Sequence, residues 1–285
     1  MIWWFRGRQL TFERVRLVGI LNVTPDSFSD GGEYFSEQKA VEQALKMEEA
    51  GADMIDIGGE STRPQAETIS VEEELRRILP VLVGIRSKTQ IPLSIDTTKP
   101  EVARVALEAG ADILNDVNGL TAASVMADLA REFGAGLILM HRRGTPATMQ
   151  SLTHYQDVVQ DVFDELDSSF KEVVGRGVSP EQIVLDPGLG FAKTAEQNLE
   201  LIRGLERFQA WNRPVLVGPS RKSFVGKLID EEVPSQRDWG TAAAVALCVA
   251  YGAQWVRVHE VAAMRDVIQV TQAILEAGSR SYVRS

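Results

Sequence analysis

The sequence contains a single cysteine, Cys248, so no disulfide can form within the chain. Long apolar runs are also absent. The longest, residues 242–251, is far shorter than the roughly 20 residues that a membrane-spanning helix needs. Residues 1–8 lack the apolar core and the small-residue cleavage site of a secretory signal. We therefore expect a cytoplasmic protein that has no membrane partner.

An excess of positive charge is missing as well. The chain has 30 Lys and Arg against 40 Asp and Glu, which gives a formal net charge of −10. Proteins that bind nucleic acid present a basic surface, so this balance argues against that class of partner. An anionic small-molecule substrate would have to be held by a local cluster of cations. No Pro-rich, Ser-rich or low-complexity segment divides the chain, which predicts a single domain over residues 1–285.

Short apolar runs alternate with helical segments, such as 37–49 and 71–87, along the whole sequence. The runs are almost continuously apolar, which is typical of parallel strands that are buried on both faces. Strand–helix alternation over this length predicts an α/β fold of the (β/α)8 TIM-barrel type, which takes about 250 residues. The eight predicted strands are Leu17–Val23, Met54–Gly58, Leu93–Asp96, Ile113–Val117, Leu137–His141, Ile183–Asp186, Val215–Gly218 and Trp255–His259.

The alternative to a barrel is an open doubly wound sheet. We favour the barrel because polar residues follow the carboxyl end of every run, whereas an open sheet concentrates them at one switch point. A weak repeat supports regular βα units, since Gly51 and Gly110 each end a helix directly before a strand. Residues 2–12, leading into 15–17, are expected to form a hairpin that closes the bottom of the barrel.

The carboxyl ends of barrel strands meet at one rim, where barrel enzymes have their active sites. Asp96, Asn115 and Asp186 occupy three of these ends, and their acceptors and amide suit a flat heterocycle with N–H donors. Asn22 and Asp30 are oxygen ligands of the kind that Mg²⁺ prefers. A cationic set at the same rim suits a phosphate or carboxylate group: Lys222, Arg63, Arg257 and His259. The residues alone therefore predict a site for a heterocycle that carries phosphate, together with a second anionic substrate.

Five segments, in order and spacing, resemble the signatures of the dihydropteroate synthase family: 19–32, 56–64, 186–191, 220–224 and 257–259. The resemblance extends from Gly19 to the C-terminal helix. It implies a TIM-barrel transferase of folate biosynthesis that forms homodimers, uses Mg²⁺ and is a target of sulfonamides. The implied reaction joins 6-hydroxymethyl-7,8-dihydropterin pyrophosphate to 4-aminobenzoate and yields 7,8-dihydropteroate and pyrophosphate.

The resemblance also implies roles for individual residues. The pterin subsite would consist of Asp96, Asn115, Met140, Asp186 and Lys222. The pyrophosphate subsite would consist of Asn22, Arg257 and His259, with Asn22 also holding Mg²⁺. The 4-aminobenzoate subsite would consist of Phe28, Thr62, Arg63, Pro64, Phe191, Lys222 and Ser223. The residues expected to take part in catalysis are Asp96, Lys222, Asp30 and Arg63.

Two other functions remain open from the sequence. A pterin-dependent methyltransferase would share the barrel and its pterin-binding acids, but it would have no use for the anion-binding segment 220–223. A non-catalytic paralogue would serve as a binding scaffold, although no expected catalytic residue is missing. The main departures from the family pattern are Gln65 and Ala192, which stand where glycine is usual.

Overall fold

The computed structural model describes residues 1–24, 32–60, 68–117 and 123–277. Eight parallel strands within this part of the chain form one sheet, in the order β8-β7-β6-β5-β4-β3-β10-β9. The strands are β3 (Arg16–Asn22), β4 (Met54–Gly58), β5 (Leu93–Asp96), β6 (Ile113–Asp116), β7 (Gly136–Met140), β8 (Ile183–Asp186), β9 (Leu216–Val217) and β10 (Trp255–Val258).

The two edges of the sheet meet. Leu185 of β8 forms a parallel bridge with Val215, and the Leu185 amide donates to the Pro214 carbonyl at 3.0 Å, an ordinary hydrogen-bond distance. The sheet is therefore a barrel, which confirms the predicted (β/α)8 architecture and shows that the open doubly wound sheet is wrong. The strands match the predicted runs closely. β9 is shorter than predicted because Pro214 and Pro219 flank it and proline has no amide hydrogen to donate.

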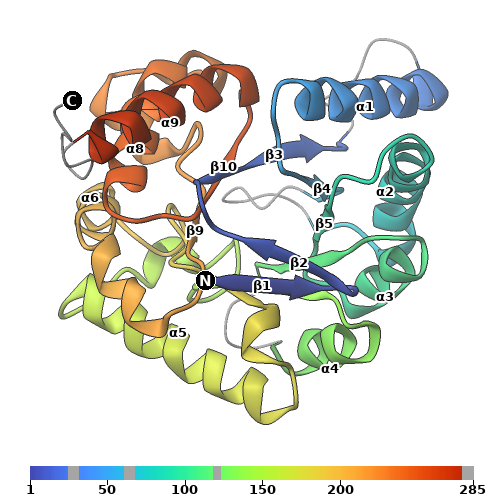
Figure 1. Ribbon diagram of the computed structural model, residues 1–285, viewed down its shortest axis with the longest axis horizontal. Coiled ribbons are helices and arrows are strands. Elements are labelled where there is room, and N and C mark those ends of the chain that lie inside the picture. The colour runs from blue at the N-terminus through green and yellow to red at the C-terminus, as the bar shows by residue number, and fades with distance from the viewer. Residues whose placement is uncertain (25–31, 61–67, 118–122, 278–285) are drawn as a thin grey trace, which may run out of the picture.

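Helices surround the barrel (Figure 1). They are α1 (Gly32–Glu49), α2 (Val71–Arg86), α3 (Pro100–Glu108), α4 (Ala123–Phe133), α5 (Val158–Gly175), α6 (Ala195–Arg203), α7 (Ser223–Leu228), α8 (Asp238–Ala250) and α9 (Val261–Glu276), with short 3-10 turns at Met149–Ser151, Pro180–Gln182, Leu205–Trp211 and Pro234–Gln236. No helix within the described residues has both the length and the apolar character needed to cross a membrane.

The helices form for ordinary local reasons. In α2, the Ser70 side chain accepts from the Glu73 amide at 3.2 Å and caps the first turn. Its buried face carries Ile78, Leu82 and Ile85, which are spaced to lie on one side of a helix. Apolar faces of this kind pack on the outside of the barrel and form the larger of the two main cores.

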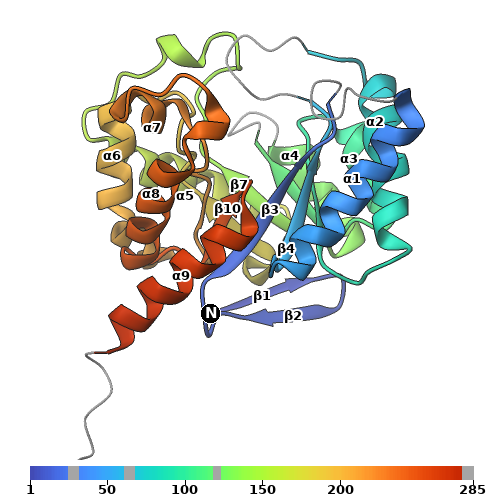
Figure 2. The same cartoon turned by 90° about the horizontal axis from the view of Figure 1, so that it is seen from above.

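An N-terminal hairpin closes the bottom of the barrel, as predicted (Figure 2). Strand β1 (Ile2–Phe5) pairs antiparallel with β2 (Arg8–Thr11) across a turn in which Arg6 and Gly7 both have positive φ. Trp3 is fully buried, and its indole nitrogen donates to the Gln182 carbonyl at 2.9 Å. The hairpin therefore seals the end of the barrel opposite to the carboxyl ends of the strands.

A second core fills the barrel directly above the hairpin. Trp3 and Phe5 pack there against one inward residue from most strands, namely Val18, Met54, Ile113, Ile138, Val184, Leu216 and Trp255. Side chains alternate between the two faces of a strand, so the next inward position lies two residues further along. Those next positions are Ile20, Asp56, Asn115, Met140, Asp186, Gly218 and Arg257. The floor of the barrel is thus apolar, and the layer above it is mainly polar.

Candidate active site

A pocket opens at this polar layer. Its lining is Asp96, Asn115, Val117, Met140, Asp186, Leu189, Phe191, Gly218, Lys222 and Arg257. The structure therefore brings together most of the residues predicted from the strand ends. The prediction did not single out Val117, Leu189 or Gly218.

Arg257 is the centre of a charged network in the pocket. Its Nε donates to Asp56 Oδ2 at 2.6 Å and its Nη2 donates to Asp96 Oδ2 at 2.8 Å. Asn115 Nδ2 donates to the same oxygen of Asp56 at 3.0 Å. Charges this deeply placed are tolerated because each is paired with an opposite charge or a hydrogen-bond donor.

The role of Asp56 was not predicted from the sequence. This residue has no exposed surface and connects Arg257 to Asn115. It therefore holds in place one residue predicted for the pyrophosphate subsite, Arg257, and one predicted for the pterin subsite, Asn115. The sequence could have indicated this role, since Asp56 is the one charged residue in the predicted strand Met54–Gly58. Its other oxygen, Oδ1, and Oδ1 of Asp96 are buried without a hydrogen-bond partner among the described residues. Such oxygens are ready to accept hydrogen bonds from a ligand.

The two acids that line the pocket have perturbed pKa values. Burial raises the pKa of Asp96 to about 7, although the positive charge of Arg257 acts in the opposite direction. Burial also raises the pKa of Asp186 to about 6, against a hydrogen bond from the Gly188 amide, which lies 2.7 Å from Asp186 Oδ1. Perturbed acids in a cleft are a mark of functional sites.

Lys222 enters the pocket from the start of α7. Burial and the nearby charge of Arg257 lower its pKa to about 8, although the charges of Asp186 and Asp96 act in the opposite direction. Its Nζ lies 4.1 Å from the centre of the Phe191 ring, a cation–π arrangement. The ammonium group and the aromatic ring therefore form one wall of the pocket.

The remaining predicted residues lie around this pocket. Asn22 is half-buried at the end of β3, and a Cβ on Gly58 would lie 3.9 Å from its Oδ1 and 3.9 Å from Asp96 Cγ. His259 follows β10, and its Nδ1 lies 2.9 Å from Ser220 Oγ. Ser223 is exposed at the first position of α7. Asn22, His259 and Ser223 do not line the pocket itself. His259 lies two residues after the lining residue Arg257, and Ser223 follows Lys222 directly.

Several predicted residues lie outside the described part of the chain: Phe28, Asp30, Thr62, Arg63, Pro64 and the family departure Gln65. The other departure, Ala192, is described. It has φ +51°, a left-handed conformation that residues other than glycine seldom adopt. This backbone geometry explains why glycine is usual at the position.

Chemically, the pocket combines acceptors for N–H donors, a cation network and an aromatic wall. The acids Asp96 and Asp186 line it with Asn115, and the cations Lys222 and Arg257 line it as well. This arrangement can bind a flat heterocycle rich in N–H groups and can stabilise charge that develops beside it. No group of three or more His, Cys, Asp or Glu suited to a metal ion lies within the described residues.

Comparisons with known proteins agree with this description. A family model described as "Pterin binding enzyme" matches residues 18–259. A dihydropteroate synthase from Synechocystis sp. is 50% identical over 262 residues, which cover 92% of this chain and 91% of the relative.

Solved structures give the same result. A dihydropteroate synthase from Xanthomonas albilineans with 4-aminobenzoic acid is 42% identical, has a TM-score of 0.89, and is matched over 96% of this chain and 99% of that one. Another structure of a dihydropteroate synthase from that organism, in complex with 7,8-dihydropteroate, is 41% identical, with a TM-score of 0.85 over 94% of this chain and 97% of that one.

Proposed function

The chain belongs to the pterin-binding enzyme family and, within it, to the dihydropteroate synthases, and from this premise we propose how its residues carry out the reaction. The reaction transfers a pterinylmethyl group from 6-hydroxymethyl-7,8-dihydropterin pyrophosphate to the amine of 4-aminobenzoate. The single observation that carries the assignment of residues is the convergence of Asp96, Asn115, Asp186 and Lys222 on one pocket.

The pterin ring is held by the acids and the amide. Its ring N–H and amino groups donate to Asp96 and Asp186, and Asn115 adds an amide that Asp56 orients. Oδ1 of Asp96 is a buried acceptor without a partner among the described residues, as a donor-rich ligand requires. Lys222 donates to the ring carbonyl, and Met140 packs against the ring face. Asp96 and Asp186 bind such donors best when they are ionised.

Catalysis requires charge to separate. Pyrophosphate leaves with the electron pair of the C–O bond, and positive charge develops on the pterin. The Asp96 carboxylate, whose side chain is only 10% exposed, stabilises that charge. Arg257 and His259 bind the departing anion, and Arg257 Nη1 is not used in its bonds to Asp56 and Asp96. The amine of 4-aminobenzoate then forms the new bond to the methylene carbon and loses a proton.

The second substrate is placed beside the aromatic wall. Phe191 and Lys222, which lie 4.1 Å apart from ring centre to Nζ, offer an apolar face and a cation to an aromatic carboxylate. Ser223 lies next to Lys222 at the start of α7. We assign the remaining contacts to Phe28, Asp30, Thr62, Arg63 and Pro64, which lie outside the described residues.

We assign a Mg²⁺ ion to Asn22. Mg²⁺ commonly takes only one or two protein oxygens and completes its coordination with substrate phosphate and water. A half-buried amide oxygen at the carboxyl end of β3 fits this pattern without a cluster of acids. When bound, the ion neutralises charge on the pyrophosphate leaving group.

We also propose that the protein is a cytoplasmic homodimer. Helices α8 and α9 pack together and carry apolar side chains that face solvent, including Leu247, Val270 and Ile274, which are 50%, 61% and 69% exposed. Val270 and Ile274 are four residues apart and lie on one face of α9. A second copy that covers this face would remove the apolar surface from water.

An assay of the purified chain decides the function. With pterin pyrophosphate, 4-aminobenzoate and Mg²⁺, we expect release of pyrophosphate and formation of 7,8-dihydropteroate. Absence of pyrophosphate release would reject the assignment. Methyl transfer from methyltetrahydrofolate to a corrinoid acceptor would instead support the methyltransferase alternative. Absence of both activities would support the non-catalytic paralogue.

A further inference from the structure

The loop that carries Phe191 follows β8 and has an unusual backbone. Gly188, Gly190 and Ala192 all have positive φ, at +71°, +84° and +51°. An L-residue such as Ala192 pays roughly 1 kcal/mol or more for that conformation. A backbone of this kind persists only when its surroundings hold it. Residues 187–192 therefore need support from their surroundings to place Phe191 against Lys222.

Lys193 supplies a large part of that support. It is only 4% exposed, and its Nζ lies 3.0 Å from His141 Nδ1, 2.9 Å from the Gly188 carbonyl oxygen and 2.9 Å from the Phe191 carbonyl oxygen. A protonated lysine has three hydrogens to donate and no acceptor. The three partners match the three donors of an ammonium group, and two of them belong to the loop. Burial lowers the pKa of Lys193 to about 7, and the charges of Asp186 and Glu165 act in the opposite direction.

The partner His141 is itself held from α5. Its Nε2 lies 2.9 Å from Glu165 Oε2. Burial acts to raise the pKa of Glu165, but hydrogen bonds from His141 and Arg143 outweigh it and lower that pKa to about 2, so the carboxylate only accepts. Nε2 therefore carries the imidazole hydrogen, and Nδ1 is left to accept from Lys193. Burial lowers the pKa of His141 to about 4, which keeps the ring neutral.

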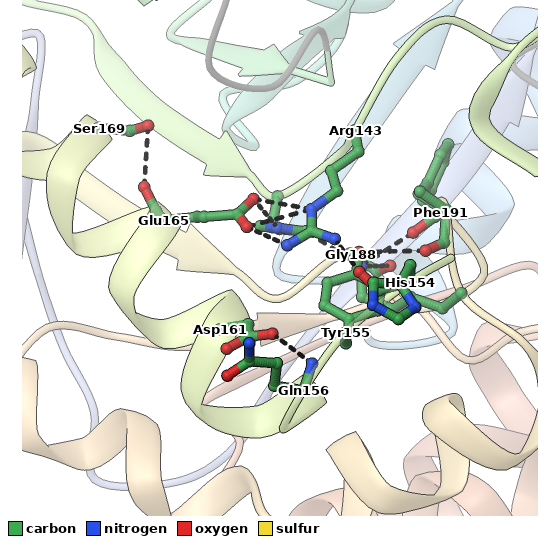
Figure 3. Close-up of polar contacts among 12 residues, drawn as sticks. Arg143, His154, Tyr155, Gln156, Asp161, Glu165, Ser169, Gly188 and Phe191 are labelled. Carbon is green, nitrogen blue, oxygen red and sulfur yellow. Dashed lines mark hydrogen bonds and ion pairs between the residues drawn. The ribbon is translucent and has the colours of Figure 1, made fainter. Parts of the chain in front are cut away.

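Arg143 and Tyr155 complete the cluster. Figure 3 shows the guanidinium of Arg143 directed at the carboxylate of Glu165, with Gly188 and Phe191 on the other side of the cluster. The same guanidinium lies 3.8 Å from the centre of the Tyr155 ring. The Tyr155 hydroxyl donates to the Ala192 carbonyl at 3.1 Å, so a second contact reaches the strained end of the loop.

We propose that Lys193 is a positioning residue for the second-substrate subsite. Its ammonium group anchors the loop 187–192 to His141, which Glu165 holds in turn. It thereby fixes the position of the Phe191 ring next to Lys222. Lys193 does not line the pocket, so it acts through Phe191 and not on the substrate. The inference rests on the proposed function, because it concerns binding of 4-aminobenzoate.

The test compares Lys193→Met with Lys171→Met. Lys171 lies on α5, and its side chain is 74% exposed, so it is a matched control. We expect Lys193→Met to raise KM for 4-aminobenzoate about tenfold, as for the loss of one hydrogen bond from a charged donor. Lys171→Met should leave KM within about twofold, as is usual for an exposed side chain. A merely structural role would lower the amount of active enzyme and leave KM unchanged, which would overturn the proposal.

A double-variant cycle shows whether Lys193 acts through Phe191. If it does, adding Lys193→Met to Phe191→Leu should raise KM for 4-aminobenzoate little beyond the effect of Phe191→Leu alone. Independent effects, in which the two fold-changes multiply, would overturn the proposal. Should Lys193→Met fail to fold, Glu165→Gln removes the charge that orients His141. It should raise the same KM about threefold, near the loss expected of a neutral hydrogen bond, and an unchanged KM would count against the proposal.

The two hypotheses fail in different ways. If the wild-type enzyme turns over and the KM of Lys193→Met is unchanged, the role of Lys193 is refuted and the function stands. If the wild-type protein releases no pyrophosphate, the function is refuted. A crystal structure of Lys193→Met then decides the geometric claim: displacement of the Phe191 ring from Lys222 supports it, and an unmoved ring overturns it.

Discussion

Arg257 Nη2 lies 2.8 Å from Asp96 Oδ2, and this contact joins residues that are 161 positions apart in the sequence. It links the end of β10 to the end of β5 across the barrel mouth. The pair sets the charge state of the pocket, because the guanidinium opposes the effect of burial on the pKa of Asp96.

The first prediction concerns pH. Asp186 and Asp96, with pKa values raised to about 6 and about 7, lose their charge as pH falls, whereas Lys222, with a pKa lowered to about 8, loses its charge as pH rises. We expect the pH profile of kcat/KM for the pterin substrate to be bell-shaped. The apparent pKa of each limb would describe the coupled groups of the pocket together and not one residue. Arg257→Met should move the acid limb upward by about one pH unit, since a nearby cation no longer favours the carboxylate.

The control for that experiment is Arg104→Met. Arg104 forms an exposed ion pair with Glu132, with side chains that are 44% and 52% accessible. It should reproduce the wild-type profile. An acid limb that stays in place in Arg257→Met would contradict the role given to this pair.

A second prediction tests the residues assigned to catalysis. Asp96→Asn keeps the shape of the side chain but removes the charge, and Lys222→Met removes the ammonium group. Each should lower kcat by roughly 10²–10³, a typical loss for a group that stabilises developing charge. Lys227→Met, on the exposed side of α7, should keep wild-type turnover. Wild-type rates in Asp96→Asn or Lys222→Met would refute the site assignment.

Removal of the Asn22 amide should affect the metal requirement. We expect Asn22→Ala to raise the Mg²⁺ concentration for half-maximal turnover about tenfold, because the ion would lose a protein oxygen. Titration of Mg²⁺ at saturating substrates measures this. A half-saturation value equal to that of the wild-type enzyme would place the ion elsewhere.

The fourth prediction is a loss of stability in acid. The pKa of His141 is lowered from 6.5 to about 4, so the folded protein binds fewer protons here than the unfolded chain does. The contribution of the neutral, buried His141 to the free energy of unfolding is present above pH 6.5 and is lost as pH falls toward 4. It amounts to roughly 3 kcal/mol of unfolding free energy by the usual conversion.

Urea unfolding between pH 7 and pH 4 measures this contribution. His141→Asn should be less stable at pH 7 and should show a smaller decline toward acid. His154→Asn, at an exposed position, should decline as the wild-type protein does. Parallel curves for all three proteins would show that His141 does not titrate as described.

The fifth prediction concerns assembly. We expect sedimentation at micromolar concentration to show a dimer, and we expect Ile274→Lys to shift it to monomer by placing a charge within the apolar face of α9. Val83→Lys is the control, since Val83 on α2 is 51% exposed and lies away from that face. A wild-type monomer, or a dimer that tolerates Ile274→Lys, would exclude this interface.

The sequence by itself determined the barrel and the membership of its polar rim. Each buried strand is an almost continuously apolar run, and Met54–Gly58 and Ile183–Asp186 were predicted with the bounds that the structure has. Closing eight parallel strands brings their carboxyl ends together, so Asp96, Asn115 and Asp186 had to share one pocket. These conclusions follow from local patterning, and the roles of Phe28, Asp30, Thr62, Arg63 and Pro64 remain predictions.

Only the tertiary structure decided which polar groups pair with one another. Nothing in the local sequence of Lys193 predicts that its ammonium group meets His141, 52 positions away, or that Arg257 lies between Asp56 and Asp96. Pairings of this kind depend on distances of about 3 Å between side chains of different strands and helices. The pKa shifts depend on the same burial and contacts. The charge states of the site are therefore a property of the closed barrel and not of any segment within it.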